Sequence, residues 1–231
     1  MRKNIIILVS CVIIISCNKT DNDLLEKLDS YPLKVGNEWT YMTETVLKEY
    51  DSELFDRIIN IDTNFHISHV IIKKDTVLKD LIEVKQVRTI TNNTISDRYI
   101  NLDSEGLKQF GYFNQGFKSI YIHETPKLEI KLPLYRNSVW NYGVYQYPEL
   151  ISIEKKVIGS EILKIGNKDF LCFKIQIFND NFPGHHFFEW ISKEGLIKKQ
   201  EIYDKSELIF VDGSKYMQIT NTTTLTNMIL N

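Results

Sequence analysis

Histidine and cysteine residues that could carry chemistry are sparse in this sequence. His66 and His69 have a spacing that places two ligands on one face of a helix, but on a strand they point to opposite faces. Zinc needs three or four converging ligands. With five scattered histidines and no supporting cysteine pair, the sequence predicts no metal site. Cys172 lies between Leu171 and Phe173 in an apolar run, so we interpret it as an inert buried thiol.

A glycine-rich stretch from Gly111 to Ser119 approaches the pattern of a phosphate-binding loop. One residue too many separates Gly116 from Lys118, and no helix is expected after it, so we interpret it as an ordinary loop. A glycosidase would need two carboxylates at a defined separation across a cleft, which a sequence does not reveal. We therefore expect a non-enzymatic protein without a cofactor, with an envelope hydrolase as the remote alternative.

Aromatic side chains are the remaining candidates for a binding site. On the inside of a curved sheet they would line an apolar groove. Ordinary core packing is the competing interpretation, with Trp39 and Trp140 covering one end of the apolar face. The candidate groove consists of Trp39, Tyr41, Trp140, Tyr142, Phe188 and Trp190.

The N-terminus has the features of an export signal. Arg2 and Lys3 precede an apolar run from Ile5 to Ile15, which is too short for a membrane-spanning helix of about 20 residues and fits a signal h-region. Ile14-Ile15-Ser16-Cys17 resembles a bacterial lipobox, in which the cysteine is lipidated. Leu8-Val9-Ser10-Cys11 matches as well, but cleavage there would leave an apolar stretch on the mature end. A plain secreted protein or an uncleaved membrane anchor would also be compatible with such a start.

We therefore divide the chain into a lipoprotein signal peptide (1–16), a lipidated cysteine with a flexible tether (17–30) and a β-rich domain (31–231). A single acyl chain binds membranes only marginally, whereas bacterial lipoproteins of this type carry two or three, palmitate among them. The tether contains Asp21 and Asp23, which resembles the acidic segments that direct lipoproteins to the outer face of the outer membrane. The expected location is the bacterial outer membrane, facing the periplasm or the surface.

The composition is that of a folded domain with little helix. Of 231 residues, 43% are hydrophobic and 25% charged, which excludes a disordered chain. The net charge of −2 gives no electrostatic footprint for nucleic acid. Alanine, the best helix former, does not occur in the sequence, whereas isoleucine, which favours strands, is abundant.

Two segments of the domain resemble one another. Pro32-Leu33 and Pro133-Leu134 are each followed by Trp seven residues after the Pro and by Tyr nine residues after it. Further matches, displaced by 89 residues, join Lys79–Lys85 to Lys168–Lys174, Tyr99 to Phe188, and Glu105-Gly106-Leu107 to Glu194-Gly195-Leu196. We interpret these as two related units, 31–130 and 131–231, that share one core.

Period-two alternation indicates strands throughout. Apolar residues alternate with polar ones from Ile59 to Ile71, which predicts a half-buried strand, and again from Leu171 to Ile177. Asn92-Asn93, Gly166-Asn167 and Asp212-Gly213 predict tight turns between antiparallel neighbours. Residues 49–59 are the best, though weak, helical candidate. The expected fold is all-β, a curved antiparallel sheet or half-barrel built from two strand units.

The lipobox, the tether, the segment Tyr31–Tyr41, the second Pro-Leu…Trp and the Phe188-Glu189-Trp190 stretch resemble uncharacterised outer-membrane lipoproteins of the Bacteroidota type. The layout is also similar to the curved sheets of lipoprotein-carrier and periplasmic β-domain families. These resemblances imply a non-enzymatic envelope lipoprotein with a binding or structural role. The alternative is a carrier or sensor of an apolar ligand in the concave sheet. The implied partners are the membrane, through the acyl chains, and an apolar ligand or another envelope protein.

Replacing Cys17 with serine should release the protein from the membrane fraction, because no acyl chain can then be attached. Fractionation after labelling with a radioactive fatty acid measures both effects. Cys11→Ser is the matched control and should leave labelling and membrane association unchanged. Membrane retention of the Cys17→Ser protein would show that the lipobox assignment is wrong.

Overall fold

The structure is a computed structural model that describes residues 27–116, 119–146, 150–179, 184–210 and 213–231. The predicted signal peptide, Cys17 and most of the predicted tether lie outside these residues. The described chain consists of strands and a single 3-10 turn at Lys79–Leu81. The strands are β1 (Lys27–Leu28), β2 (Glu38–Tyr50), β3 (Ile58–Val77), β4 (Glu83–Thr91), β5 (Thr94–Leu102), β6 (Gly106–Asn114), β7 (Tyr121–Lys131), β8 (Leu134–Tyr135), β9 (Val139–Gln146), β10 (Leu150–Ile165), β11 (Lys168–Asn179), β12 (His185–Ser192), β13 (Gly195–Phe210) and β14 (Gly213–Ile229).

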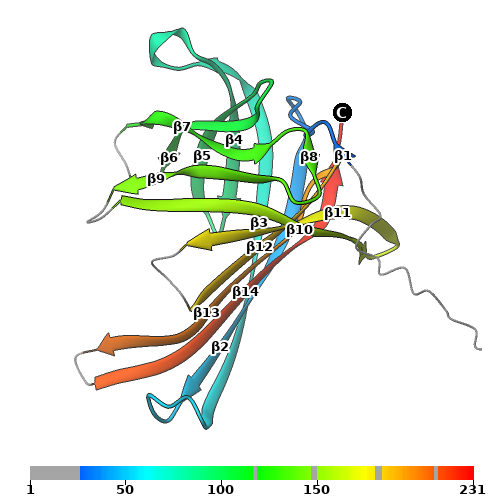
Figure 1. Cartoon of the computed structure of the whole chain (residues 1–231). Coiled ribbons are helices and arrows are strands. Elements are labelled where there is room, and N and C mark those ends of the chain that lie inside the picture. The colour runs from blue at the N-terminus through cyan, green and yellow to red at the C-terminus, as the bar shows by residue number, and fades with distance from the viewer. Residues whose placement is uncertain (1–26, 117–118, 147–149, 180–183, 211–212) are drawn as a thin grey trace, which may run out of the picture.

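Twelve of these strands form one antiparallel sheet in the order β7-β6-β5-β4-β3-β2-β14-β13-β12-β11-β10-β9. Neighbours in the sheet are neighbours in sequence, except where β2 pairs with β14 along nearly its whole length. β1 and β8 form a separate two-stranded ribbon. The predicted all-β fold with a curved antiparallel sheet is therefore confirmed (Figure 1).

The sheet curls until its two edge strands, β7 and β9, approach each other. The indole N–H of Trp140 in β9 donates to the backbone carbonyl of Leu128 in β7 at 3.0 Å. Register shifts interrupt the β9–β10, β10–β11, β5–β6 and β6–β7 pairings. Such bulges increase local twist and bend a sheet, and they contribute to the curvature of the cup. The result is a nearly closed cup.

The core lies on the concave face of the cup. Val157, Phe173, Ile175 and Ile197 are completely buried there, together with Ile72 from β3. The segment before β2 covers one end of the cup, where Asn37 donates to the carbonyl of Pro32 at 2.9 Å and accepts from the amide of Asn231 at 2.8 Å. The Pro-Leu-x5-Trp segment thus fastens the C-terminal end of the chain to the top of the sheet.

Tight turns occur where the sequence predicts them. Asn92 and Asn93 both have positive φ, 45° and 66°, and join Thr91 to its cross-strand partner Thr94. Two positive φ angles in a two-residue loop are the geometry that matches strand twist, and Asn tolerates them better than most residues. The Gly166-Asn167 loop likewise joins β10 to β11.

The matched sequence segments occupy matched places in the strand order. Trp39 is the second residue of β2 and Trp140 the second of β9. Gly106 and Gly195 open β6 and β13 with φ of 139° and 110°. A Cβ on Gly106 would lie 2.1 Å from the carbonyl oxygen of Ile130, so no side chain fits. Descent of the two halves from one repeated unit stays a prediction.

Three details differ from the sequence-based expectations. Residues 49–59, the helical candidate, form the end of β2, a loop and the start of β3. Lys27 and Leu28, at the end of the expected tether, form β1, and Leu28 is buried in the core. The alternation in β3 is present, but its apolar face from Ile59 to Ile71 lies on the outer side of the sheet, where Ile61, Phe65 and Ile67 are exposed. Val70 and Ile72, which line the cavity, belong to the opposite face.

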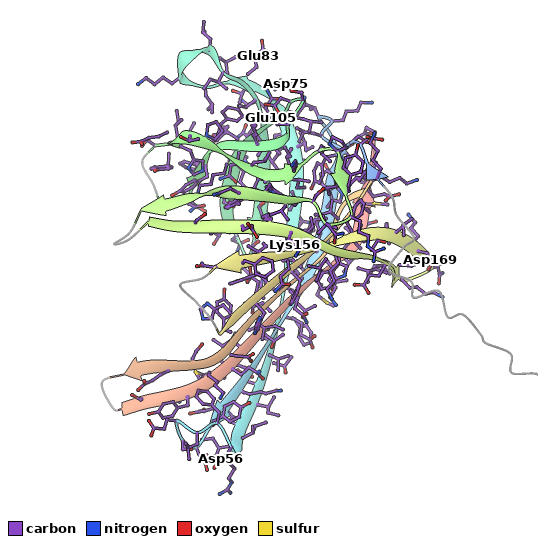
Figure 2. The ribbon with its side chains drawn as sticks, in the orientation of Figure 1. Asp56, Asp75, Glu83, Glu105, Lys156 and Asp169 are labelled. Carbon is purple, nitrogen blue, oxygen red and sulfur yellow. The ribbon has the colours of Figure 1, made fainter. Side chains whose placement is uncertain are left out.

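Two long hairpins, β2–β3 and β13–β14, pair through β2 and β14 and extend away from the cup as a twisted arm (Figure 1). Figure 2 shows Asp56 at the end of this arm, opposite Asp75, Glu83 and Glu105 at the far end of the cup. At the tip, the ring of Phe55 packs against Tyr50 and Tyr216 with centroid distances of 5.1 and 5.8 Å.

Trp140→Phe should lower the free energy of unfolding by about 1–3 kcal/mol, because the Leu128 carbonyl loses its donor where the sheet closes. Urea unfolding followed by circular dichroism measures this change. Val139→Ala, at an exposed neighbouring position of β9, should change stability by less than about 0.5 kcal/mol. Equal stability of the two variants would argue that the β7–β9 contact does not hold the cup closed.

Candidate functional site

The concave face encloses an apolar cavity of about 110 Å³. Its walls come from both halves of the sheet and from the segment that covers the top of the cup. Tyr41 donates its hydroxyl to the carbonyl of Leu196 at 3.0 Å, and burial raises its pKa well above 10.0, so it stays neutral. The lining residues that are apolar or aromatic are Tyr31, Leu33, Trp39, Tyr41, Val70, Ile72, Val87, Ile100, Leu107, Ile130, Ile191 and Leu196.

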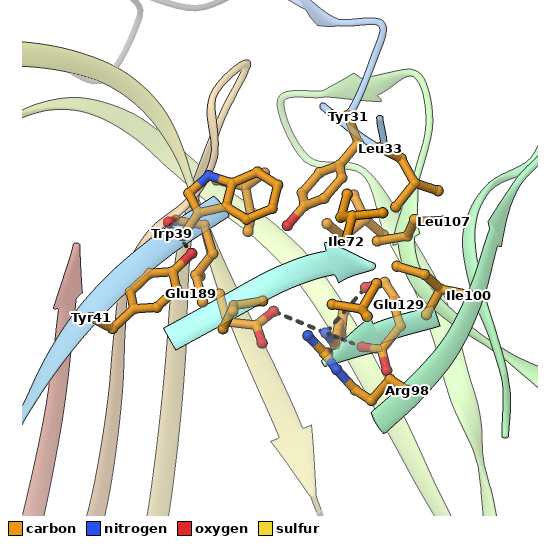
Figure 3. A pocket seen from close by; sticks show the side chains of 16 residues that line it. Tyr31, Leu33, Trp39, Tyr41, Ile72, Arg98, Ile100, Leu107, Glu129 and Glu189 are labelled. Carbon is orange, nitrogen blue, oxygen red and sulfur yellow. Dashed lines mark hydrogen bonds and ion pairs between the residues drawn. The ribbon is translucent and has the colours of Figure 1, made fainter. Parts of the chain in front are cut away.

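A layer of charged side chains lies below this apolar cavity (Figure 3). Lys155 of β10 is 3% exposed and binds a carboxylate oxygen of Glu189 in β12 at 2.9 Å. Its ammonium also donates to the backbone carbonyl of Glu129 in β7 at 3.1 Å and lies 3.8 Å from the carboxylate of that residue. One buried cation therefore connects three strands across the inside of the cup.

The electrostatics favour the ionised forms of Glu189 and Lys199. Burial alone would raise the pKa of Glu189, but Lys155, Lys199 and Arg98 outweigh it and hold the pKa below 4.5. Burial would lower the pKa of Lys199, yet Glu201 and Glu189 raise it above 10.5. A general acid needs a carboxyl pKa raised toward the working pH. The pKa of the Glu189 carboxyl is shifted in the opposite direction, so this group does not suit the role of a general acid.

Arg98 is the cation of this layer without a hydrogen bond or ion pair to a described residue. It lies in β5 beside Asp97, whose carboxylate faces the outside of the sheet and binds Arg88 in a bidentate pair at 2.8 and 3.0 Å. Arg98 points the opposite way and lines the inner cavities. Its side chain remains exposed, since it faces open space instead of packed neighbours.

A wider cavity of about 460 Å³ continues from the charged layer toward the open side of the cup. Arg98, Glu129, Lys155 and Glu189 line both cavities, so the two spaces meet at these residues. The lining of the wider cavity is completed by Gln109, Tyr142, Ile153, Ile177, Asn179, Phe187, Lys199 and Glu201. The site as a whole is apolar at its closed end and charged at its open end.

The structure brings together half of the aromatic residues proposed from the sequence. Trp39 and Tyr41 line the apolar cavity, and Tyr142 lines the wider one. Trp140 is buried at the β7–β9 contact. Phe188 and Trp190 alternate with Glu189 along β12 and therefore face the other side of the sheet, where Lys174 lies 5.1 and 5.0 Å from their rings.

The charged layer was not anticipated from the sequence, although one signal for it exists. Ile153, Lys155 and Val157 alternate along β10, which places a lysine on an apolar face. Phe187, Glu189 and Ile191 repeat this pattern in β12. A charged residue inside an apolar period-two stripe is costly to bury unless it is paired, so each pattern points to a buried partner.

Other candidate chemistry is located elsewhere. Burial raises the pKa of the Cys172 thiol to about 12, which makes it a poor nucleophile. His69 contacts Thr40 at 3.2 Å on the outer face of β3. The described residues contain no group of three or more histidine, cysteine or acidic side chains placed to hold a metal ion.

The described residues also form no helix with the length and hydrophobicity needed to cross a bilayer.

Comparisons with known proteins give little further information. No protein-family model matches the chain, and no curated protein matches it. A match among solved structures is the crystal structure of a "putative outer membrane lipoprotein-sorting protein domain" from Vibrio parahaemolyticus. It is 10% identical, and the match covers 85% of this chain and 86% of that chain with a TM-score of 0.26. At this score the likeness carries no argument about function.

Lys155→Met should destabilise the protein by about 3–5 kcal/mol at neutral pH, because it leaves the Glu129 and Glu189 carboxylates without their buried cation. The folded-state pKa of Glu189 lies below 4.5, so the stabilisation it provides is complete above that pH and is lost as the pH falls. The difference between wild type and variant should therefore shrink in acid. Denaturant unfolding at several pH values measures it.

Lys108→Met is the control, because Lys108 pairs with Asp103 and Glu105 at the protein surface. Its removal should cost less than about 1 kcal/mol. A Lys155→Met protein that is as stable as wild type at neutral pH would contradict the assigned role of the buried cation.

Proposed function

We propose that this chain is a non-enzymatic binding protein of the bacterial cell envelope, anchored through acyl chains at Cys17, that holds a ligand with an apolar portion inside the cup. The observation that supports this most directly is the open apolar cavity, which a purely structural sheet would have filled with side chains. Protein interiors are normally packed to the density of organic crystals.

The layout of the site indicates how such a ligand is oriented. Its apolar portion fits the closed end among Trp39, Val87 and Ile130, where it removes apolar surface from water. The remainder lies in the wider cavity beside the charged layer, whose volume of about 460 Å³ falls within the usual range of small-molecule sites, about 300–1,000 Å³. Entry occurs from the open side of the cup.

The ionised state of the charged layer supports a binding role over the hydrolase alternative. Glu129 and Glu189 both face Lys155, and the pKa of Glu189 is lowered rather than raised. A glycosidase needs one carboxyl group that stays protonated to donate a proton to the leaving oxygen. The pair here instead serves to satisfy a buried ammonium group.

Filling the apolar cavity should abolish binding of a neutral apolar probe. The fluorescence of N-phenyl-1-naphthylamine should rise when it is mixed with the purified chain and should stay low with Val87→Phe, whose larger side chain occupies the cavity. Ile162→Phe adds the same bulk at an exposed position and should bind the probe like wild type. Mass spectrometry of solvent extracts then identifies any lipid that co-purifies.

A wild-type protein that fails to bind the probe and contains no extractable apolar molecule would refute the proposal. Binding that survives in Val87→Phe would place the ligand on another surface. Circular dichroism and the unfolding midpoint of each variant verify that it is folded.

A further inference from the structure

The arm of the molecule has an unpaired strand edge along the first half of β3. β4 pairs with β3 from Ser68 onward, so residues 58–67 are hydrogen-bonded only to β2. The backbone N–H and C=O groups on their other side have no strand partner among the described residues. β7 and β9, the terminal strands of the sheet, instead lie against each other at the cup.

This free edge also has an exposed apolar face. Ile61, Phe65 and Ile67 are 58%, 61% and 54% exposed. They point to the same side of the arm as Met42, which is Ile67's cross-strand partner in β2. Exposed apolar side chains on a long, flat edge are what natural sheets usually avoid, and their clustering marks a contact surface.

The usual protection of an edge strand is missing here. Between Asn60 and Ile67 there is no proline and no lysine, and the β2–β3 pairing has no register shift in this stretch. Its one carboxylate is Asp62, on the opposite face from Ile61. An edge of this kind is a template for another strand.

We propose that two copies of this chain pair through this edge, antiparallel and in register about Thr63, to form one continuous sheet. When a two-fold axis stands perpendicular to the sheet, directly opposed residues of the two copies have their side chains on the same face. Because side chains alternate between the faces along a strand, the axis must lie where one residue is opposite its own copy. With the axis at Thr63, Ile61 lies opposite Phe65 of the second copy, and Ile59 lies opposite Ile67. Apolar cross-strand pairs of this kind stabilise a sheet.

Charge and geometry select this register over its neighbours. An axis through Asp62 would place two carboxylates opposite each other, whereas the axis at Thr63 places Asp62 opposite Asn64. An axis through Asn64 would bring Asn60, Ile59 and Ile58 opposite Ser68, His69 and Val70, where β4 already occupies the edge. The axis at Thr63 pairs residues 59–67 with one another and brings only Ile58, the first residue of β3, opposite Ser68.

Site-specific cysteines test the register. Directly opposed residues in an antiparallel pair have Cα atoms about 4.5–5.5 Å apart, within the range that a disulfide spans. In a chain with Cys11→Ser and Cys17→Ser, Thr63→Cys should form disulfide-linked dimers under mild oxidation. Asn60→Cys is the matched control, since its two copies would lie about 20 Å apart along the strands, and it should stay unlinked.

Sedimentation equilibrium tests the association itself. The purified protein should show twice its monomer mass, and Ile61→Lys should return it to the monomer mass, because the substitution places a charge opposite Phe65 of the second copy. Val77→Lys, at the exposed far end of the same strand, should remain a dimer. Circular dichroism establishes that both variants are folded.

The proposal would be overturned if the wild-type protein is monomeric and the Thr63→Cys variant forms no disulfide-linked dimer. So would a dimer that persists in Ile61→Lys, or equal cross-linking of Thr63→Cys and Asn60→Cys, since the contact would then lie elsewhere. None of these results depends on whether the cup binds a ligand.

Discussion

The buried ammonium group of Lys155 is the interaction on which the shape of the cup depends. It reaches the carbonyl of Glu129 in β7 and the carboxylate of Glu189 in β12 from its own place in β10. β12 is separated from β10 by β11 alone, but β7 lies at the opposite edge of the sheet, so the contact with Glu129 links parts of the sheet that only curvature brings together. Each of these groups would be costly to bury alone, and together they stabilise the curled arrangement.

The same charged layer explains how an apolar cavity persists beside it. Apolar side chains around an empty space normally relax to fill it. Here the cavity floor consists of ionised groups that keep contact with the open side of the cup, and Arg98 adds a cation with exposed surface. The walls above are held by the sheet and by Trp39, whose indole donates to the carbonyl of Glu194 at 2.8 Å. A pre-formed site results, apolar at one end and charged at the other.

Local patterns predicted the strands, the tight turns and the curved sheet, because alternation and turn chemistry depend on residues that are near in sequence. They did not predict the site, since Arg98, Glu129, Lys155 and Glu189 come from four strands spread over the chain. Nor did they predict which side of β3 is buried. The apolar period from Ile59 to Ile71 lies on the outer face of the sheet, whereas Val70 and Ile72 line the cavity from the inner face. The aromatic groove was only half right for a similar reason, since alternation along β12 turns Trp190 outward and Glu189 inward.

The pairing of β2 with β14 has a consequence for how the chain acquires its structure. The first and the last long strands lie side by side in the middle of the sheet, joined by register contacts from Glu38–Ile229 to Tyr50–Tyr216. Contacts between such distant parts of a chain form slowly, because a long loop must first be closed. During synthesis β2 has its hairpin partner β3 but lacks its other neighbour until the last residues appear. The two halves therefore cannot join into one sheet until β14 has been synthesised.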